Sequence, residues 1–274
     1  MNESPLWEQW PIRVKRCREG AMIYNVNDEY IGRSLDTYGE ISREEVDLYR
    51  QILQPSMTAL EVGANIGVHT IPLARCVGPG GRVVAFEPQR IVFQMLCANV
   101  ALNALANVVT HQAAVGRETG TVMVPAVDYL QPGNFGGVSL GAGGSGETVR
   151  VVTIDSLELS ACHFIKIDVE GMERDVIEGA ADTIRRFRPR LYIENDRREK
   201  SQALIGQLLD LDYRLYWHLP RLFSADNFFG RKENLFENVV SVNMIGIPRS
   251  GPLSLLVRGA REITSASANW QSAA

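Results

Sequence analysis

One short stretch, residues 57–70, constrains the fold more than any other part of the chain. Its apolar residues from Met57 to Val62 suit a buried parallel strand, and Gly63 and Gly67 follow. Glycines at such positions permit backbone angles and close approaches that a side chain would prevent. From Val68 to Val77 the apolar residues recur at helical spacing, so the stretch predicts strand, tight turn and helix. In open parallel sheets this junction binds nucleotides.

The residues around the turn indicate which nucleotide. A dinucleotide site needs Gly-x-Gly-x-x-Gly, whose second glycine lets the backbone approach a pyrophosphate. Asn65 stands at that position, and Glu61 ends the strand with a carboxylate that pairs with an ammonium group but repels phosphate. Glu87 follows a second strand and is expected to accept hydrogen bonds from ribose hydroxyls. Together they favour S-adenosylmethionine; the alternative is a glycine turn with acids that only cap a helix.

Composition sets limits on domain number, compartment and partners. With 274 residues and 45% hydrophobic content, the chain can form one large domain or one domain with additions. Its 28 basic and 32 acidic residues leave a net charge of -4, which makes no electrostatic case for nucleic acid. No apolar run approaches a membrane span or a signal peptide. Scattered cysteines indicate reduced thiols in a cytoplasmic, soluble protein, at Cys17, Cys76, Cys97 and Cys162.

The order of predicted elements indicates the fold class. Strands and helices alternate from residue 57 to residue 211, which argues for a parallel sheet with right-handed crossovers. Two further strands, over 213–219 and 239–247, are expected to end the sheet antiparallel. A pure dinucleotide fold lacks that reversal. We therefore predict an α/β, class I (Rossmann-like) methyltransferase fold, with a mostly parallel seven-stranded doubly wound sheet and an antiparallel last strand.

Three parts of the chain are expected to surround this sheet. Residues 1–55 form an N-terminal segment that is either a lid or a sheet cap, with a capping box of Ser42 and Glu45 at a helix start. The methyltransferase domain covers 56–250, with a glycine-rich flap at 116–150 and a substrate loop at 220–238. The tail, 251–274, is expected to be disordered over its last ten residues.

Polar side chains end two neighbouring strands. Asp168 and Glu170 follow the strand from Phe164, and Glu194 and Asn195 end the next strand. Buried strands rarely end in carboxylates that nothing satisfies, and the carboxyl ends of parallel strands face the ligand. The alternative is that Asp168 and Glu170 cap the helix that follows.

Several blocks together resemble the FkbM family of S-adenosylmethionine-dependent methyltransferases. They are Glu61–Thr70, Phe86–Pro88, Phe164–Gly171 with Glu173, and Asn238–Pro248, besides Tyr38-Gly39-Glu40 and Asn134–Gly137. The resemblance covers about residues 20–248, and the Lys-Ile-Asp-Val-Glu-Gly block is its specific part. It implies an O-methyltransferase acting on a hydroxyl of a small natural product or glycan.

Candidate site residues follow from these patterns. Catalytic candidates are Asp168, Glu170 and Glu194. Cofactor-binding candidates are Tyr38, Glu61, Gly63, Asn65, Gly67, Thr70, Glu87, Pro88, Ala114 and Asp168. Acceptor-binding candidates are Asn134, Phe135, Asn227, Phe228 and Asn234. Two mechanisms stay open: a carboxylate acts as general base, or Asp168, Glu194 and Asn195 hold a Mg²⁺ that lowers the pKa of the acceptor hydroxyl.

Two other functions compete with methyl transfer. One is an NAD-dependent oxidoreductase on a similar sheet; Asn65 and the antiparallel end of the sheet tell against it. The other is a non-catalytic cofactor-binding module, which would not need the polar strand ends. The expected partner is a small-molecule or glycan hydroxyl acceptor, with no nucleic acid and no membrane span, and homo-oligomer formation stays open.

Overall fold

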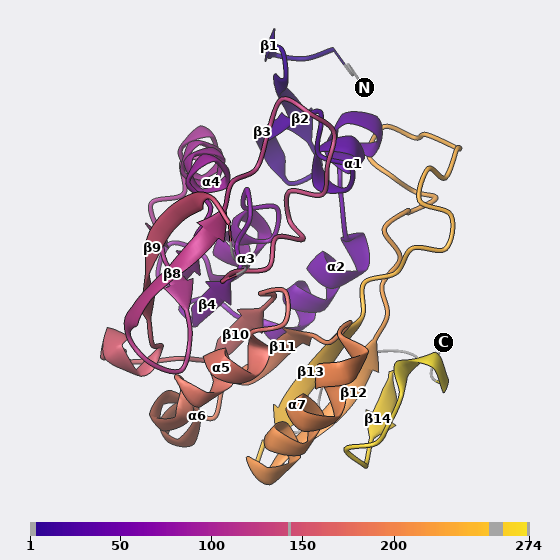
Figure 1. Ribbon diagram of the computed structural model, residues 1–274. Helices are drawn as coiled ribbons and strands as arrows, with labels where there is room; N and C mark the ends of the chain where they lie inside the picture. Colours follow the sequence, from indigo (N-terminus) through magenta and orange to yellow (C-terminus); the bar gives the residue numbers. More distant parts are fainter. Residues whose placement is uncertain (1–3, 142–143, 252–259, 273–274) are drawn as a thin grey trace.

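The computed structural model describes residues 4–141, 144–251 and 260–272, and an eight-stranded sheet lies at its centre (Figure 1). From edge to edge the strands are β6, Val108–His111; β5, Arg82–Phe86; β4, Thr58–Val62; β10, Phe164–Ile167; β11, Arg190–Glu194; β13, Asn243–Pro248; β12, Tyr213–His218; and β14, Arg261–Ile263. The first five are parallel, and β13 is antiparallel to both of its neighbours. The predicted class I topology is confirmed.

The edge of the sheet that contains β13, β12 and β14 differs in detail from the prediction. Of the two strands expected to be antiparallel, only β13 reverses direction, because β12 is antiparallel to β13 and so runs with the parallel set. β14 adds an eighth strand, antiparallel to β12, and comes from the tail. A short 3-10 helix, η2, spans Trp270–Ser272. The buried Ile263 and the partly buried Trp270 pack on the core, so the tail is structured there; residues 252–259 and 273–274 lie outside the described part.

Helices cover both faces of the sheet. One face packs on α5, Glu173–Glu178, α6, Ala181–Phe187, and α7, Arg198–Asp210. The opposite face packs on α2, Arg43–Ile52, and α3, Thr70–Val77, while α4, Arg90–Leu102, follows β5. Alternate strand residues point to opposite faces. Ala59 and Phe164 pack in the α2 and α3 cluster, so Glu61 and Lys166, two residues further along, point to that same face.

The N-terminal segment forms a small sheet and two helices. β1, Trp7–Gln9, β2, Ile12–Cys17, and β3, Gly20–Asn25, are antiparallel, and α1, Ile31–Tyr38, precedes α2. The expected capping box at α2 does not form: Ser42 has φ 52° and makes no side-chain cap hydrogen bond. Glu45 is instead buried, with its carboxylate directed to Tyr49 and Asn243.

The expected flap contains a second, three-stranded sheet. β7, Ala114–Val115, β8, Gly120–Pro125, and β9, Gly146–Val152, pair in the order β7-β9-β8, and the short 3-10 helix η1, Asp155–Leu157, follows. Within residues 108–115 the chain passes from β6 of the central sheet to β7 of this smaller sheet. The segment between β8 and β9 reaches the N-terminal segment, where Gly133 bridges to Asp28.

A long connection from β12 to β13, drawn in orange in Figure 1, runs up to α1. The Tyr38 hydroxyl donates to Glu233 O and accepts from Leu235 N–H, and Phe229 N–H donates to Tyr38 O. In the described part of the chain no helix is long and apolar enough to cross a membrane. The four cysteines are free thiols.

Candidate active site

The glycine turn after β4 is closely packed against the next parallel strand. Gly63 has φ +83°, and a Cβ atom there would lie 1.8 Å from the backbone oxygen of Asp168. Glu87 holds the other side of the turn: its Oε2 accepts from Asn65 N–H at 2.9 Å and its Oε1 from Gln89 N–H at 2.8 Å. The turn and the carboxylate are therefore held together by backbone hydrogen bonds.

Two hollows meet at this turn. The larger is a cleft of about 450 Å³ at the carboxyl ends of the strands, and the smaller has a volume of about 40 Å³. They share the lining residues Gly63, Glu87, Gly136, Asp168 and Glu170. The rest of the smaller pocket is mainly apolar, formed by Val62, Phe86, Pro88, Ala113, Ala114, Val115, Val138, Leu140, Val169 and Met172, with Gln89. Such a lining suits a flat base beside a carboxylate that can bind its ribose.

Glu61 lies behind the turn rather than in the cleft. It is fully buried, and its Oε2 accepts from Thr70 Oγ1 at 2.5 Å. Its Oε1 has no hydrogen-bond partner among the described residues, and burial raises its pKa to about 7 although the Lys166 charge opposes this. Gly67 and Thr70 likewise lie outside both linings and shape the turn from within.

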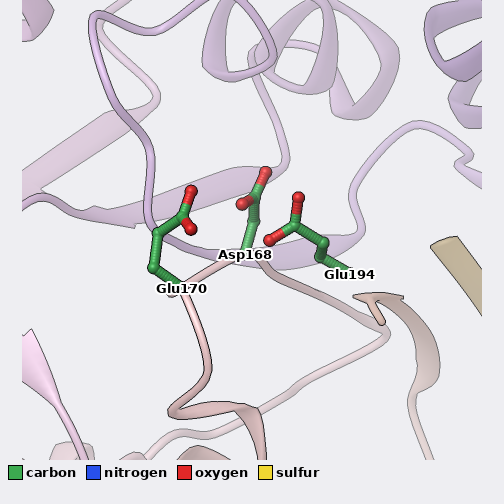
Figure 2. Close-up of side chains that lie close together, drawn as sticks. All are labelled: Asp168, Glu170 and Glu194. Atoms are coloured by element: carbon green, nitrogen blue, oxygen red, sulfur yellow. The ribbon is translucent and has the colours of Figure 1, made fainter. Parts of the chain in front are cut away.

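Three carboxylates gather at the ends of β10 and β11, as Figure 2 shows. Asp168, Glu170 and Glu194 each place an oxygen within 4.8 Å of the others. Lys166, buried in β10, donates from Nζ to Asp168 Oδ2 at 2.8 Å. Burial raises the pKa of Asp168, but the Lys166 ammonium outweighs burial and holds this pKa below its usual value. Asp168 therefore stays ionised in a crowded acidic site.

Glu194 and Glu170 bind protons more tightly. Burial, and then the charge of Asp168, raise the pKa of Glu194 well above its ordinary value. The protonated form of Glu194 is thereby favoured, and in that form it can donate a hydrogen bond to Asp168. The Oε2 atom of Glu194 has no hydrogen-bond partner among the described residues. Burial and Asp168 also raise the pKa of Glu170 to about 7, although Glu170 is paired with Arg197.

The metal set expected from the sequence is not assembled. Asn195 is buried, and its Nδ2 donates to Ser201 Oγ at 2.9 Å and to Met244 Sδ at 3.2 Å, outside the cleft lining. Adjacent residues in an extended strand point to opposite sides, so Glu194 and Asn195 do not share one pocket. Glu170 takes the third place beside Asp168 and Glu194.

The acceptor-binding candidates separate into two groups. Asn134 lines the cleft and accepts from Gly137 N–H, while Phe135 is buried against Tyr129 just below it. Asn227 and Asn234 lie outside the cleft because their amides hydrogen-bond to the backbone of their own loop, and Phe228 lies there too, beside Arg18. Tyr38, expected at the cofactor, is likewise absent from the lining and holds that loop instead.

Several cleft residues were not predicted. Lys166 is one; further polar examples, from well-separated parts of the chain, are Tyr30, Ser42, Glu45, His69, Arg197, Ser241 and Asn243. The sequence signal for Lys166 was a lysine in an otherwise apolar strand. Glu45 was not predicted because it resembles a helix-capping residue. Asn243 was not predicted because it lies inside a strand.

The class I methyltransferase fold is defined by a mostly parallel sheet in which β13 is reversed, a glycine turn without the dinucleotide pattern and an acid after β5. The family model described as Methyltransferase FkbM domain matches residues 61–215, and the chain belongs to this family. The alternative of a dinucleotide fold is thereby set aside.

Relatives cover only part of this chain. 31-O-demethyl-FK506 methyltransferase FkbM of Streptomyces tacrolimicus is 34% identical over 110 residues, 40% of each chain. Methyltransferase 1 of Beauveria bassiana is 26% identical over 146 residues, 45% of this chain and 58% of its own. The chain thus spans about half the length of these relatives. The crystal structure of Methyltransferase FkbM from Methylobacillus flagellatus aligns with TM-score 0.48 and 20% identity over 73% of this chain and 50% of that one.

Proposed function

We propose that this protein transfers a methyl group from S-adenosylmethionine to a hydroxyl oxygen of a small natural product or a glycan. The observation that carries the proposal is the Asp168 carboxylate, which accepts a hydrogen bond from Lys166 Nζ and lies beside Glu194 in the cleft next to the glycine turn. Membership in the FkbM methyltransferase family supports the reaction class. The name of the Streptomyces relative, a 31-O-demethyl-FK506 methyltransferase, supports an oxygen acceptor.

The residues around the turn fit the methyl donor. The apolar pocket beside Pro88 and Ala114 suits adenine, and Glu87 retains free lone pairs for ribose hydroxyls after accepting two backbone N–H groups. The unpartnered Glu61 Oε1 gives the cofactor's amino acid end a negative field behind the turn. When bound, S-adenosylmethionine supplies a sulfonium methyl group that is already activated for transfer.

The chain's own residues orient the acceptor and remove its proton. A free alcohol is a poor nucleophile, so a carboxylate within reach of the hydroxyl assists transfer by accepting its proton. Asp168 fills this role because Lys166 keeps it ionised, and Glu194 fixes its orientation by donating a hydrogen bond. Closure of the cleft by its neighbouring segments excludes water from the reaction.

Two measurements test the proposal. Calorimetry with S-adenosylmethionine, and with NAD as the competing ligand, should show binding of the first only. Incubation with hydroxyl compounds and S-adenosylmethionine should then give products heavier by one methylene unit in mass spectrometry, with S-adenosylhomocysteine in equal amount. Binding of NAD alone, or methylation confined to nitrogen or carbon, would contradict the assignment.

A divalent cation at the same carboxylates is the second candidate arrangement. Asp168, Glu170 and Glu194 offer oxygen ligands of the kind Mg²⁺ prefers. Lys166 and Arg197 already compensate two of these charges, which favours the metal-free mechanism. Full activity in EDTA removes the cation from the mechanism, whereas loss in EDTA with recovery on adding Mg²⁺ establishes it.

A further inference from the structure

One wall of the cleft comes from outside the region that the family model matches. Residues 61–215 contain the glycine turn and the three carboxylates. Ser42 and Glu45, at the start of α2, and Ser241 and Asn243, before and in β13, line the same cleft from outside that range. The matched range therefore contains the proposed cofactor and base residues, and the wall outside it offers contacts for the acceptor.

Glu45 is the charged residue of this wall, and its hydrogen bonds are long. It is 3% exposed; its Oε1 accepts from Asn243 Nδ2 at 3.5 Å and its Oε2 from the Tyr49 hydroxyl at 3.2 Å. Both distances exceed the ordinary range for their donors. Ser42 also interacts with this carboxylate, whose pKa burial raises to about 7. The carboxylate retains lone pairs for a further donor, and the cleft is where that donor can come from.

His69 provides a second, independent observation. It is 9% exposed, lines the cleft and lies with Nε2 3.5 Å from Glu45 Oε2. Burial lowers its pKa to about 3, so the ring is neutral. The Glu45 carboxylate favours the proton on Nε2, which leaves Nδ1 as an acceptor. Nδ1 has no hydrogen-bond partner among the described residues.

The charge of the cleft excludes one class of acceptor. Its acidic lining residues are Glu45, Glu87, Asp168, Glu170, Glu194 and Asp196, against two cations, Lys166 and Arg197. Even with Glu194 protonated and the pKa of Glu45, Glu87 and Glu170 raised to about 7, the acids outnumber the cations. Both cations are already paired, with Asp168 and Glu170 respectively. A phosphate or carboxylate on the acceptor would meet a negative field with no cation left to bind it.

We propose that Glu45, together with His69, forms an acceptor subsite that binds a second hydroxyl of a neutral, polyhydroxylated acceptor, and that Asn243 positions Glu45. The acceptor is thus a glycoside rather than a nucleoside diphosphate sugar. This inference rests on the proposed methyl transfer to oxygen. Because Glu45 and Asp168 line the same cleft, the second hydroxyl is bound in the cleft that holds the base.

The test compares Glu45→Gln with Glu44→Gln in the full chain. Glu44 is the adjacent, exposed residue of α2 and serves as the matched control. The probes are methyl hexosides, their monodeoxy derivatives and the matching nucleoside diphosphate sugars, with radiolabelled S-adenosylmethionine. Loss of a hydrogen bond to a charged group corresponds to roughly a 10- to 100-fold rise in KM for the hexoside, with kcat retained.

We expect hexosides to be methylated and nucleotide sugars to be poor acceptors. The monodeoxy derivative that lacks the bound hydroxyl should have the same KM with the wild-type enzyme and with Glu45→Gln. Three results would each overturn the subsite. They are a preference for a nucleotide sugar, equal KM values for Glu45→Gln and Glu44→Gln, and no methylation of any hexoside by an enzyme that binds S-adenosylmethionine. Calorimetry separates the two levels: absent S-adenosylmethionine binding by wild type contradicts the proposed function itself, and unchanged binding by Glu45→Gln shows that this variant is folded.

Discussion

The two ends of the cleft hold their carboxylates in different ways. At the cofactor end, Glu87 accepts two backbone N–H groups at 2.9 Å or less, from residues near it along the chain or on the adjacent strand. At the acceptor end, Glu45 is held at 3.2 to 3.5 Å by side chains, and its partner Asn243 is 198 residues away. Backbone donors leave little freedom, whereas long side-chain bonds leave room for a ligand to compete.

This difference indicates that the two ends of the cleft are suited to different kinds of ligand. A turn held by backbone groups suits a ligand that is the same in every turnover. A wall held by side chains from distant segments can change with few substitutions, which suits a variable acceptor. Substitutions at the cofactor end should therefore alter binding of S-adenosylmethionine, and those at the acceptor end should alter KM for the acceptor.

The largest expected effect is at Gly63. Gly63→Ala places a Cβ 1.8 Å from Asp168 O at φ +83°, so strand spacing must change. We expect destabilisation of roughly 2–5 kcal/mol and loss of S-adenosylmethionine binding, measured by urea unfolding and calorimetry. Gly230→Ala is the control, since its φ is +71° with nothing within 4 Å. Equal losses in the two variants would show that the close approach is unimportant.

Next is the proposed base. Asp168→Asn keeps the shape of the side chain but cannot accept the acceptor's proton, so kcat should fall by roughly 10²- to 10⁴-fold. Affinity for S-adenosylmethionine should change far less. Asp182→Asn, on the exposed surface of α6, is the control. Normal turnover by Asp168→Asn would refute the base assignment, and Glu194→Gln should then be measured as the alternative.

At the cofactor end, Glu87→Gln should weaken S-adenosylmethionine binding by roughly 10- to 100-fold in calorimetry. The side-chain amide of glutamine would place its own N–H group against one of the two backbone N–H groups that now donate to Glu87, so that hydrogen bond would be lost. The KM for the acceptor should stay near wild type, and Glu118→Gln, exposed in a loop, should behave as wild type. A change confined to acceptor KM would reverse the assignment of the two ends.

The pH dependence of cofactor binding should show the same carboxylates. Burial raises the pKa of Glu61 and of Glu87 to about 7, from the ordinary 4.5. Ionised Glu87 accepts hydrogen bonds from the cofactor and ionised Glu61 adds a negative field behind the turn, so affinity should rise roughly tenfold from about pH 6 to about pH 8. In the ligand-free protein, the folded state binds more protons at these two groups than the unfolded state does between pH 4.5 and about 7. The two groups should therefore lower the free energy of unfolding as the pH rises through that range. A flat affinity profile would contradict this.

The smallest effect is expected at Asn234. Its amide donates to Glu237 O and accepts from Phe236 N–H, outside the cleft. Asn234→Ala should therefore change acceptor KM by less than about twofold, as surface substitutions usually do. Asn243→Ala, which removes a donor to Glu45, should raise that KM several-fold. If Asn234→Ala produced the larger rise, the loop would contact the acceptor and the wall described above would not.

The sequence predicted the position of several residues at the ends of parallel strands, while their roles stay predictions. Pro88 and Ala114 line the apolar pocket, and Asp168, Glu170 and Glu194 meet at one edge of the sheet. The prediction failed at Asn195 because the alternation of strand residues turns that side chain away from Glu194's pocket. It also failed at Tyr38 and Asn227, whose polar groups satisfy the backbone of the 219–242 connection rather than a ligand.

The sequence by itself determined the strand, turn and helix around Gly63, the mostly parallel sheet with a reversed strand, and the acids at the strand ends. These features depend on short-range periodicity and on the direction of parallel strands. Only the tertiary structure decided that Glu45, His69 and Asn243 meet. Their contacts join α2, the start of α3 and β13, elements brought together by burial of the apolar face between them. Burial of a shared apolar face is a property of the whole core, and no local pattern around Glu45 encodes which distant polar residue will lie beside it.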